Sequence, residues 1–197
     1  MSTSGHIHLQ KDPILKKLIV KHKIKAYWGS QKNLFLDLIE IITSQQLSIK
    51  VADTIFKRFL ALFPDKPKPD DVLKVSVEKL RSVGFSNSKA RYVHNVAEAV
   101  SSGTLLLNLL EKQSDEEVKK ELLKIKGIGP WSAEMFLIFS LKRPDVFSVG
   151  DLGLRTAIEK LYGIKRDNLK KIEKLAETWC PHRSLACRYL WASLDKI

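Results

Sequence analysis

The chain has 197 residues, enough to bury a self-supporting hydrophobic core as one domain or as two small lobes. Its 34 Lys and Arg residues outnumber 22 Asp and Glu residues, which gives a formal net charge of +12 spread along the whole chain. This excess indicates a phosphate-rich partner, with nucleic acid favoured over an anionic membrane. A basic protein without any specific partner is the alternative.

The N-terminal stretch and the two cysteines exclude several other classes. MSTSGHIHLQKDP lacks the charged and apolar blocks of a secretory signal, and no apolar run approaches the ~20 residues that span a bilayer. We therefore expect a soluble intracellular protein, cytoplasmic in a prokaryote or nuclear in a eukaryote. Cys180 and Cys187 are too few for an iron–sulfur cluster, which needs about four thiolates, so we predict two reduced, buried thiols.

Apolar residues recur at intervals of three and four along most of the chain, as in amphipathic helices. Glycine and proline signals separate these segments, and no stretch shows sustained alternation of apolar and polar residues. The sequence therefore predicts an all-α protein of short helices. The expected helices are at about 13–22, 33–43, 47–63, 71–82, 88–101, 104–111, 115–125, 131–142, 151–162, 167–178 and 182–194.

The first polar junction lies within LIEIITSQQLSIKVADTIF, residues 38–56. Two adjacent glutamines, Gln45 and Gln46, end one apolar helix and begin another, among capping Ser and Thr residues. In one interpretation they only cap and solvate the junction. In the other, a long neutral amide on a rigid turn is inserted into a base stack.

A weak internal repeat relates LRSVGFSNSKARYV (80–93) to LKIKGIGPWSAEMF (123–136). Each has Leu, three residues, Gly, an apolar residue and then a polar turn into a helix. Both segments are predicted to be helix–hairpin–helix turns, and the second is the more complete of the two.

The second hairpin, residues 124–130, has features of a phosphate-binding turn. Gly127 and Gly129 are expected to take backbone angles that other residues resist, and to let an anion approach the peptide N–H groups. The next helix adds its positive N-terminal end, and Lys124 and Lys126 add charge. Ile128 is predicted to pack inward as an apolar pivot. A plain glycine turn between helices is the alternative.

Asp151 precedes an amphipathic helix in PDVFSVGDLGLRTAIEKL, and its simplest role is that of an N-cap. A carboxylate at a helix N-terminus is favoured in its charged form, which can stabilise a nearby cation or orient a water molecule. The structural and chemical roles are compatible.

Aromatic and basic residues mix in TWCPHRSLACRYLWASL, residues 178–194, as they often do in nucleic-acid sites. Core packing is nevertheless expected for Trp179 and Tyr189, and also for Phe35 in the N-terminal part of the chain.

The segments SQQLSIKVA, VGFSNSKARYV, LLKIKGIGPWSAEMFLIF, DVFSVGDLGLRTAI and WCPHRSLACRYLW together resemble the helix–hairpin–helix DNA glycosylase superfamily. Their order and spacing are most similar to its 3-methyladenine DNA glycosylase II branch, over about residues 12–194. The resemblance implies one glycosylase module over residues 1–197, made of two helical lobes with an active-site cleft between them. One lobe covers about 40–145 and contains the hairpin; the other combines about 1–39 with 146–197.

The resemblance also implies roles for individual residues. Asp151 matches the catalytic aspartate, and Gln46 matches the side chain inserted into DNA, with Leu47 as the alternative wedge. Trp131 and Trp191 match aromatic positions of the base pocket, to which Tyr27 and Trp28 are expected to contribute. The phosphate contacts implied for the hairpin are Lys124, Lys126, Gly127, Ile128, Gly129 and Ser132. The family leaves room for a monovalent cation, Na⁺ or K⁺, at Gly127 and Gly129, and requires no other metal or cofactor.

These matches predict a monofunctional glycosylase that excises alkylated purines from double-stranded DNA as a monomer. Relatives that also cut the strand carry a lysine nucleophile where this chain has Trp131, so no lyase activity is expected. One alternative is a glycosylase of the same superfamily for another damaged or mismatched base. The other is a DNA-binding module without catalytic activity.

Overall fold

The computed structural model describes residues 3–22, 24 and 33–194, and over these ranges it contains helices and no strand. The all-α prediction is confirmed. The chain divides into two compact units: unit 1 consists of residues 1–29 and 137–197, and unit 2 of residues 30–136. Over the described residues, every helix is too short or too polar to span a bilayer.

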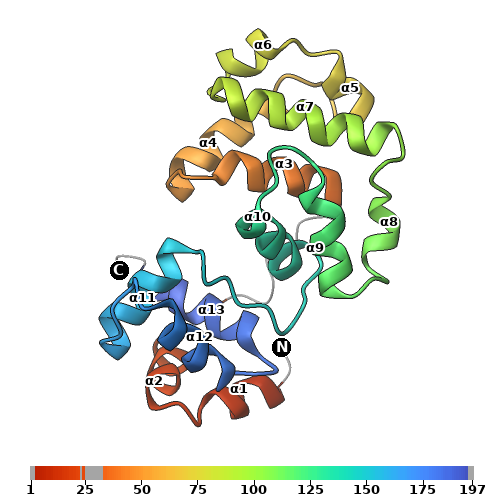
Figure 1. Ribbon diagram of the computed structural model, residues 1–197. Helices are drawn as coiled ribbons and strands as arrows, with labels where there is room; N and C mark the ends of the chain where they lie inside the picture. The colour runs from red at the N-terminus through yellow and green to blue at the C-terminus, as the bar shows by residue number, and fades with distance from the viewer. Residues whose placement is uncertain (1–2, 23, 25–32, 195–197) are drawn as a thin grey trace. The chain divides into compact units, whose positions relative to one another are not determined.

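Unit 2 is built around α3, which packs against α4, α7 and α10. Seven of its residues between Phe35 and Ile42 are buried, and Phe35 is in the core as predicted. In Figure 1, α5 and α7 lie side by side at the edge of this unit. Its helices are α3 (Leu34–Ser44), α4 (Ile49–Leu60), α5 (Pro69–Leu73), α6 (Val77–Ser82), α7 (Asn87–Ser101), α8 (Leu107–Leu110), α9 (Asp115–Leu123) and α10 (Pro130–Met135).

The unit boundaries fall earlier in the chain than the lobe limits expected from the sequence, about 40 and 145. The whole of α3 belongs to unit 2, because its apolar face is covered by helices of that unit. At the other boundary, α10 continues into a π-helix, η1 (Phe136–Ser140), and unit 1 begins at Leu137.

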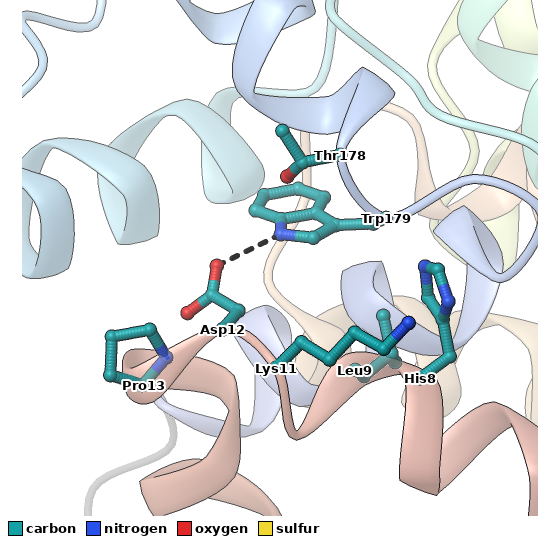
Figure 2. Close-up of a pocket in the computed structure, with 7 residues that line it drawn as sticks. All are labelled: His8, Leu9, Lys11, Asp12, Pro13, Thr178 and Trp179. Carbon is teal, nitrogen blue, oxygen red and sulfur yellow. Dashed lines mark hydrogen bonds between the residues drawn. The ribbon is translucent and has the colours of Figure 1, made fainter.

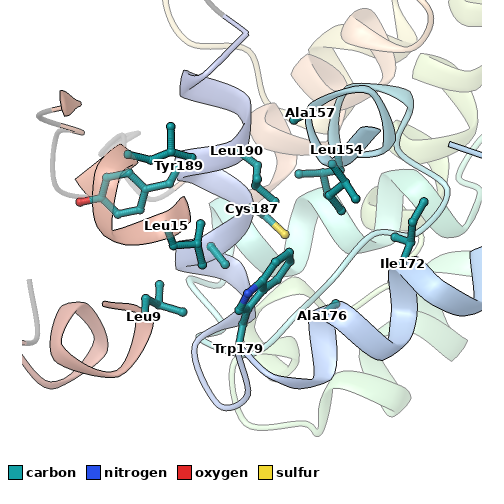
Figure 3. Packing of buried hydrophobic residues seen from close by; sticks show 13 residues of the cluster. Leu9, Leu15, Leu154, Ala157, Ile172, Ala176, Trp179, Cys187, Tyr189 and Leu190 are labelled. Atoms are coloured by element: carbon teal, nitrogen blue, oxygen red, sulfur yellow. The ribbon is translucent and has the colours of Figure 1, made fainter. Parts of the chain in front are cut away.

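Unit 1 combines the two ends of the chain around one apolar core, shown in Figure 3. Trp179 is 1% exposed and Tyr189 is 3% exposed, which confirms that both pack in the core. Helix α13 contacts both α11 and α2. The helices of this unit are α1 (Thr3–Leu9), α2 (Pro13–Lys21), α11 (Leu152–Tyr162), α12 (Leu169–Glu177) and α13 (Arg183–Ala192).

Asp12 ties the N-terminal helices of unit 1 to its C-terminal helices. One carboxylate oxygen caps α2 by accepting the N–H groups of Ile14 (2.8 Å) and Leu15 (3.0 Å). The other accepts the Tyr162 hydroxyl (2.9 Å) and the Trp179 indole N–H (3.0 Å), the latter drawn in Figure 2. Burial and this carboxylate raise the pKa of Tyr162. Asp12 is thus a structural N-cap with an indole partner.

The two cysteines differ in environment. Cys187 is a free, buried thiol, as predicted, and burial raises its pKa. Cys180 is exposed, so the prediction of a buried thiol is wrong there. It lies in the short surface turn between α12 and α13, where its Sγ donates to Asp145 (3.0 Å), which also pairs with Arg183 (2.8 Å).

Candidate active site

Asp151 is the N-cap of α11, and its carboxylate is held from two directions. Oδ1 accepts the backbone N–H of Leu154 at 2.7 Å and the indole N–H of Trp191 at 2.9 Å. The residue is 9% exposed. Both donors and the positive end of α11 present partial positive charge to this oxygen. The carboxylate is therefore fixed in position and orientation.

Gly153 leaves the space that this arrangement needs. A Cβ at position 153 would lie 3.0 Å from Asp151 Oδ1 and 3.2 Å from Trp191 Cδ1. Any side chain there would press on both members of the hydrogen-bonded pair. Gly153 was not among the predicted site residues, although its place two positions after a capping aspartate in GDLGL is a signal for it.

Trp191 lies on α13, half-buried, with its ring 5.5 Å from that of Phe139 between centroids and tilted by 30°. The sequence suggested it as a wall of the base pocket, and that role stays a prediction. The structure adds a second role, since the indole N–H orients the carboxylate of Asp151.

For the base release predicted from the sequence, we expect Trp191→Phe to be roughly 10-fold slower, because a hydrogen bond to a charged group contributes about 1.5–3 kcal/mol. The ring remains available for stacking, so DNA affinity should hold. Single-turnover release and DNA binding measure the two effects. Trp179→Phe is the matched control, since it removes an indole bond to Asp12 in the same unit. An equal rate loss in both variants would contradict a specific role for Trp191.

The hairpin between α9 and α10 depends on Gly127. Its φ of +112° is in the range that favours glycine, and a Cβ would lie 2.2 Å from Tyr92 Cγ. Ile128 is 5% exposed and packs inward, as predicted. Gly129 has φ −100° and ψ 178°, an extended backbone that any residue adopts, so the special angle expected there is wrong. A Cβ at 129 would meet nothing within 4 Å, which leaves this position open to a ligand.

The polar residues of the hairpin are engaged to different extents. Lys124 pairs with Glu121 at 2.8 Å, whereas Lys126 is exposed and belongs to none of the ion pairs described. Ser132 is 2% exposed, and its hydroxyl accepts the side-chain amide of Gln45 at 2.9 Å. The hydroxyl is therefore turned into the protein, so the phosphate contact predicted for Ser132 would fall to its backbone N–H.

Residues 44–47 form a tight turn after α3. Leu47 N–H donates to Ser44 O at 3.1 Å, Gln45 has φ −50° and ψ 124°, and Gln46 has φ +56°. These values describe a type II turn, whose third residue is usually glycine or asparagine. The structure places Gln46 at this strained position with an exposed side chain, next to Leu47, which is 39% exposed. Both candidate wedges are thus accessible.

The internal repeat is present in the backbone. Gly84 has φ +120°, close to the +112° of Gly127, and each glycine is followed two residues later by the N-cap of a helix, Ser86 or Gly129. The second turn is the tighter in side-chain packing, since a Cβ at 84 would lie 2.8 Å from Ile55, whereas a Cβ at 127 would lie 2.2 Å from Tyr92.

The remaining predicted residues are distributed as follows. Trp131 is the second residue of α10 and half-buried, whereas Tyr27 and Trp28 lie outside the described residues.

A pocket of about 180 Å³ in unit 1, shown in Figure 2, is lined by residues that include Asp12 and Trp179 and by none of the predicted site residues. Over the described ranges, no three His, Cys, Asp or Glu side chains are grouped so that they could hold a metal ion.

Comparison with known proteins identifies the class. Residues 39–182 match the model of the HhH-GPD superfamily base excision DNA repair proteins. The chain therefore belongs to this helix–hairpin–helix family of DNA repair proteins.

Individual relatives are similar over most of the chain. It is 36% identical over 165 residues to DNA-3-methyladenine glycosylase 1 of Schizosaccharomyces pombe, covering 82% of this chain and 72% of that one. It is 33% identical to the Bacillus subtilis protein YfjP over 80% of this chain, and spans 58% of the length of that relative. The solved structure of the S. pombe 3-methyladenine DNA glycosylase Mag1 with abasic DNA matches with a TM-score of 0.90 and 34% identity, over 97% of this chain and 96% of that one.

Proposed function

We propose that the protein is a monofunctional DNA glycosylase that releases alkylated purines, of the 3-methyladenine and 7-methylguanine type, in base excision repair. The observation that carries this proposal is the carboxylate of Asp151, fixed by the N–H groups of Leu154 and Trp191 in a chain of this family. The S. pombe relatives named as 3-methyladenine glycosylases support the choice of substrate class.

Extrusion of the damaged nucleotide comes first, because a base inside a duplex cannot be reached. Gln46, with Leu47 as the alternative, fills the vacated stack from its exposed turn. The extruded base carries positive charge when it is alkylated at N3 or N7, and aromatic faces attract such a ring. Trp131 and Trp191 are the proposed aromatic contacts, with Tyr27 and Trp28 as further candidates.

Hydrolysis follows at C1′ of the deoxyribose. The C1′–N bond breaks and its electron pair goes to the base, which leaves neutral while the sugar becomes oxocarbenium-like. The Asp151 carboxylate stabilises this cation and positions a water molecule. Water adds to C1′ and loses one proton, so the product is an abasic site. No strong general acid is needed, since a cationic purine is already a good leaving group.

The hairpin of unit 2 is the proposed contact for a DNA phosphate. The open space at Gly129, the N-terminal end of α10 and the charge of Lys126 favour an anion there, with Lys124 contributing beside Glu121. The carbonyls of the hairpin at Gly127 and Gly129 would hold a monovalent cation, which would add positive charge beside the phosphate, and the proposal requires no other cofactor. The protein would act as a monomer on alkylated duplex DNA, in the cytoplasm of a prokaryote or the nucleus of a eukaryote.

Duplex oligonucleotides with a single 7-methylguanine, ethenoadenine or hypoxanthine test the proposed reaction. We expect at least one of them to gain an alkali-labile abasic site, with the strand intact until heat or alkali is applied. Trp131 stands in place of a lysine nucleophile, so borohydride should trap no covalent adduct. Incision without alkali together with a trapped adduct would overturn the monofunctional assignment. Binding without any abasic product would favour the non-catalytic alternative.

A further inference from the structure

Gln45 connects the exposed turn 44–47 to the hairpin. Its side-chain Nε2 donates to the carbonyl of Gly127 and to the hydroxyl of Ser132, both at 2.9 Å. Its backbone carbonyl accepts the Lys89 ammonium at 2.6 Å. The same ammonium donates to the carbonyl of Thr43 at 2.8 Å. One residue thus joins three segments of unit 2 that are far apart in the sequence.

These bonds oppose a local strain. The left-handed conformation of Gln46 is unfavourable for a non-glycine residue, so the turn needs support from its surroundings. Lys89 supplies part of it, because a cation is favourable among the unsatisfied carbonyls at the end of α3. The ammonium is half-buried, and this burial lowers its pKa. Gln45 adds a second support, because its side chain fixes this residue of the turn to the hairpin.

We infer that Gln45 is a positioning residue, which holds the Gln46 and Leu47 wedge at a fixed distance from the phosphate-binding hairpin. This inference rests on the proposed function. A wedge must enter the stack at the base step set by the bound phosphate, and a misplacement of about 1 Å can cost roughly 100-fold in rate. Gln45 holds the wedge and the hairpin at a fixed spacing without touching the reacting atoms. Lys89 supports the other side of the turn.

Gln45→Met tests this inference, since methionine has a similar length and lacks the amide donor. We expect single-turnover base release from a duplex to fall roughly 10- to 100-fold, while release from the same lesion in single-stranded DNA falls less than about 3-fold. The fluorescence of 2-aminopurine beside the lesion, which reports unstacking, should rise less than with the wild type. Lys89→Met, which removes the other support of the turn, should show the same selective loss if Gln45→Met folds poorly.

Asn95→Leu is the matched control. The Asn95 amide donates to the carbonyl of Lys126 at 2.8 Å, so it also supports the hairpin from a side chain, but it does not join the turn 44–47. In this variant, the rate of base release should change by a similar factor on duplex DNA and on single-stranded DNA. Equal effects of Gln45→Met on both substrates, or effects no larger than those of Asn95→Leu, would overturn the inference. A wild type that releases no base would instead refute the proposed function.

Discussion

Asp151→Asn is expected to lower single-turnover base release by roughly 100- to 1,000-fold, the scale of losing one preorganised electrostatic contact to a transition state. Asparagine has nearly the same volume and keeps an Oδ1 acceptor for the N–H groups of Leu154 and Trp191. It loses the negative charge that is proposed to stabilise the sugar cation. Folding and duplex affinity should therefore stay close to those of the wild type, with melting temperature and DNA titration as the measurements.

The chain offers a closely matched control at Asp12. Asp12 also caps a helix, and it also accepts an indole N–H in unit 1, from Trp179. Asp12→Asn should cost stability, on the order of 1 kcal/mol as for a weakened N-cap, without a specific loss of base release. If Asp151→Asn keeps more than a tenth of the wild-type rate, or Asp12→Asn is equally inactive while folded, Asp151 is not the catalytic carboxylate.

Gly127→Ala is expected to destabilise the protein by roughly 2–4 kcal/mol, through an overpacked site and an unfavourable φ together. The new Cβ would lie 2.2 Å from Tyr92 Cγ on a backbone with φ +112°, so the hairpin or Tyr92 must move. Displacement of the hairpin should also weaken duplex affinity at least several-fold. Chemical denaturation and DNA titration measure the two losses.

Two further variants separate the causes. Adding Tyr92→Ala to Gly127→Ala removes the clash but not the backbone strain, and should restore part of the lost stability. Gly129→Ala is the control, since its backbone is extended and a Cβ meets nothing within 4 Å. It should change stability by less than about 0.5 kcal/mol, as at a tolerant surface position, yet weaken DNA binding if a phosphate approaches there. Unchanged stability of Gly127→Ala would contradict this description of the hairpin.

The sequence predicted most of the helices because their apolar faces repeat regularly. It did not predict α1, a short helix with little apolar periodicity, which is held by distant contacts such as Leu9 in the core and the hydrogen bond between His6 and Tyr189 (2.9 Å). The segment 71–82, predicted as one helix, is two, since Ser76 caps α6 by accepting the Lys79 N–H. The apolar pattern continues through residues 71–82, but the side-chain cap at Ser76 starts a new helix there.

The candidate site was predictable where its signals are local. A capping aspartate and a glycine hairpin can be read from short stretches of sequence, and so can Trp131 in place of a lysine. The partners of these residues cannot, because the Gln45 bond to Gly127 spans 82 residues and the Trp191 bond to Asp151 spans 40. The backbone angle of Gly129 was predicted wrongly for a different reason. In a sequence, a glycine that keeps space open cannot be distinguished from a glycine that takes a left-handed backbone angle.

The most direct test of the central claim is to identify the bases released from methylated genomic DNA by mass spectrometry. The wild-type protein should release 3-methyladenine, 7-methylguanine or both, faster than the spontaneous loss measured without protein and with Asp151→Asn. If no alkylated purine is released above that background, under conditions in which the protein binds the DNA, the assignment as an alkylpurine glycosylase is wrong.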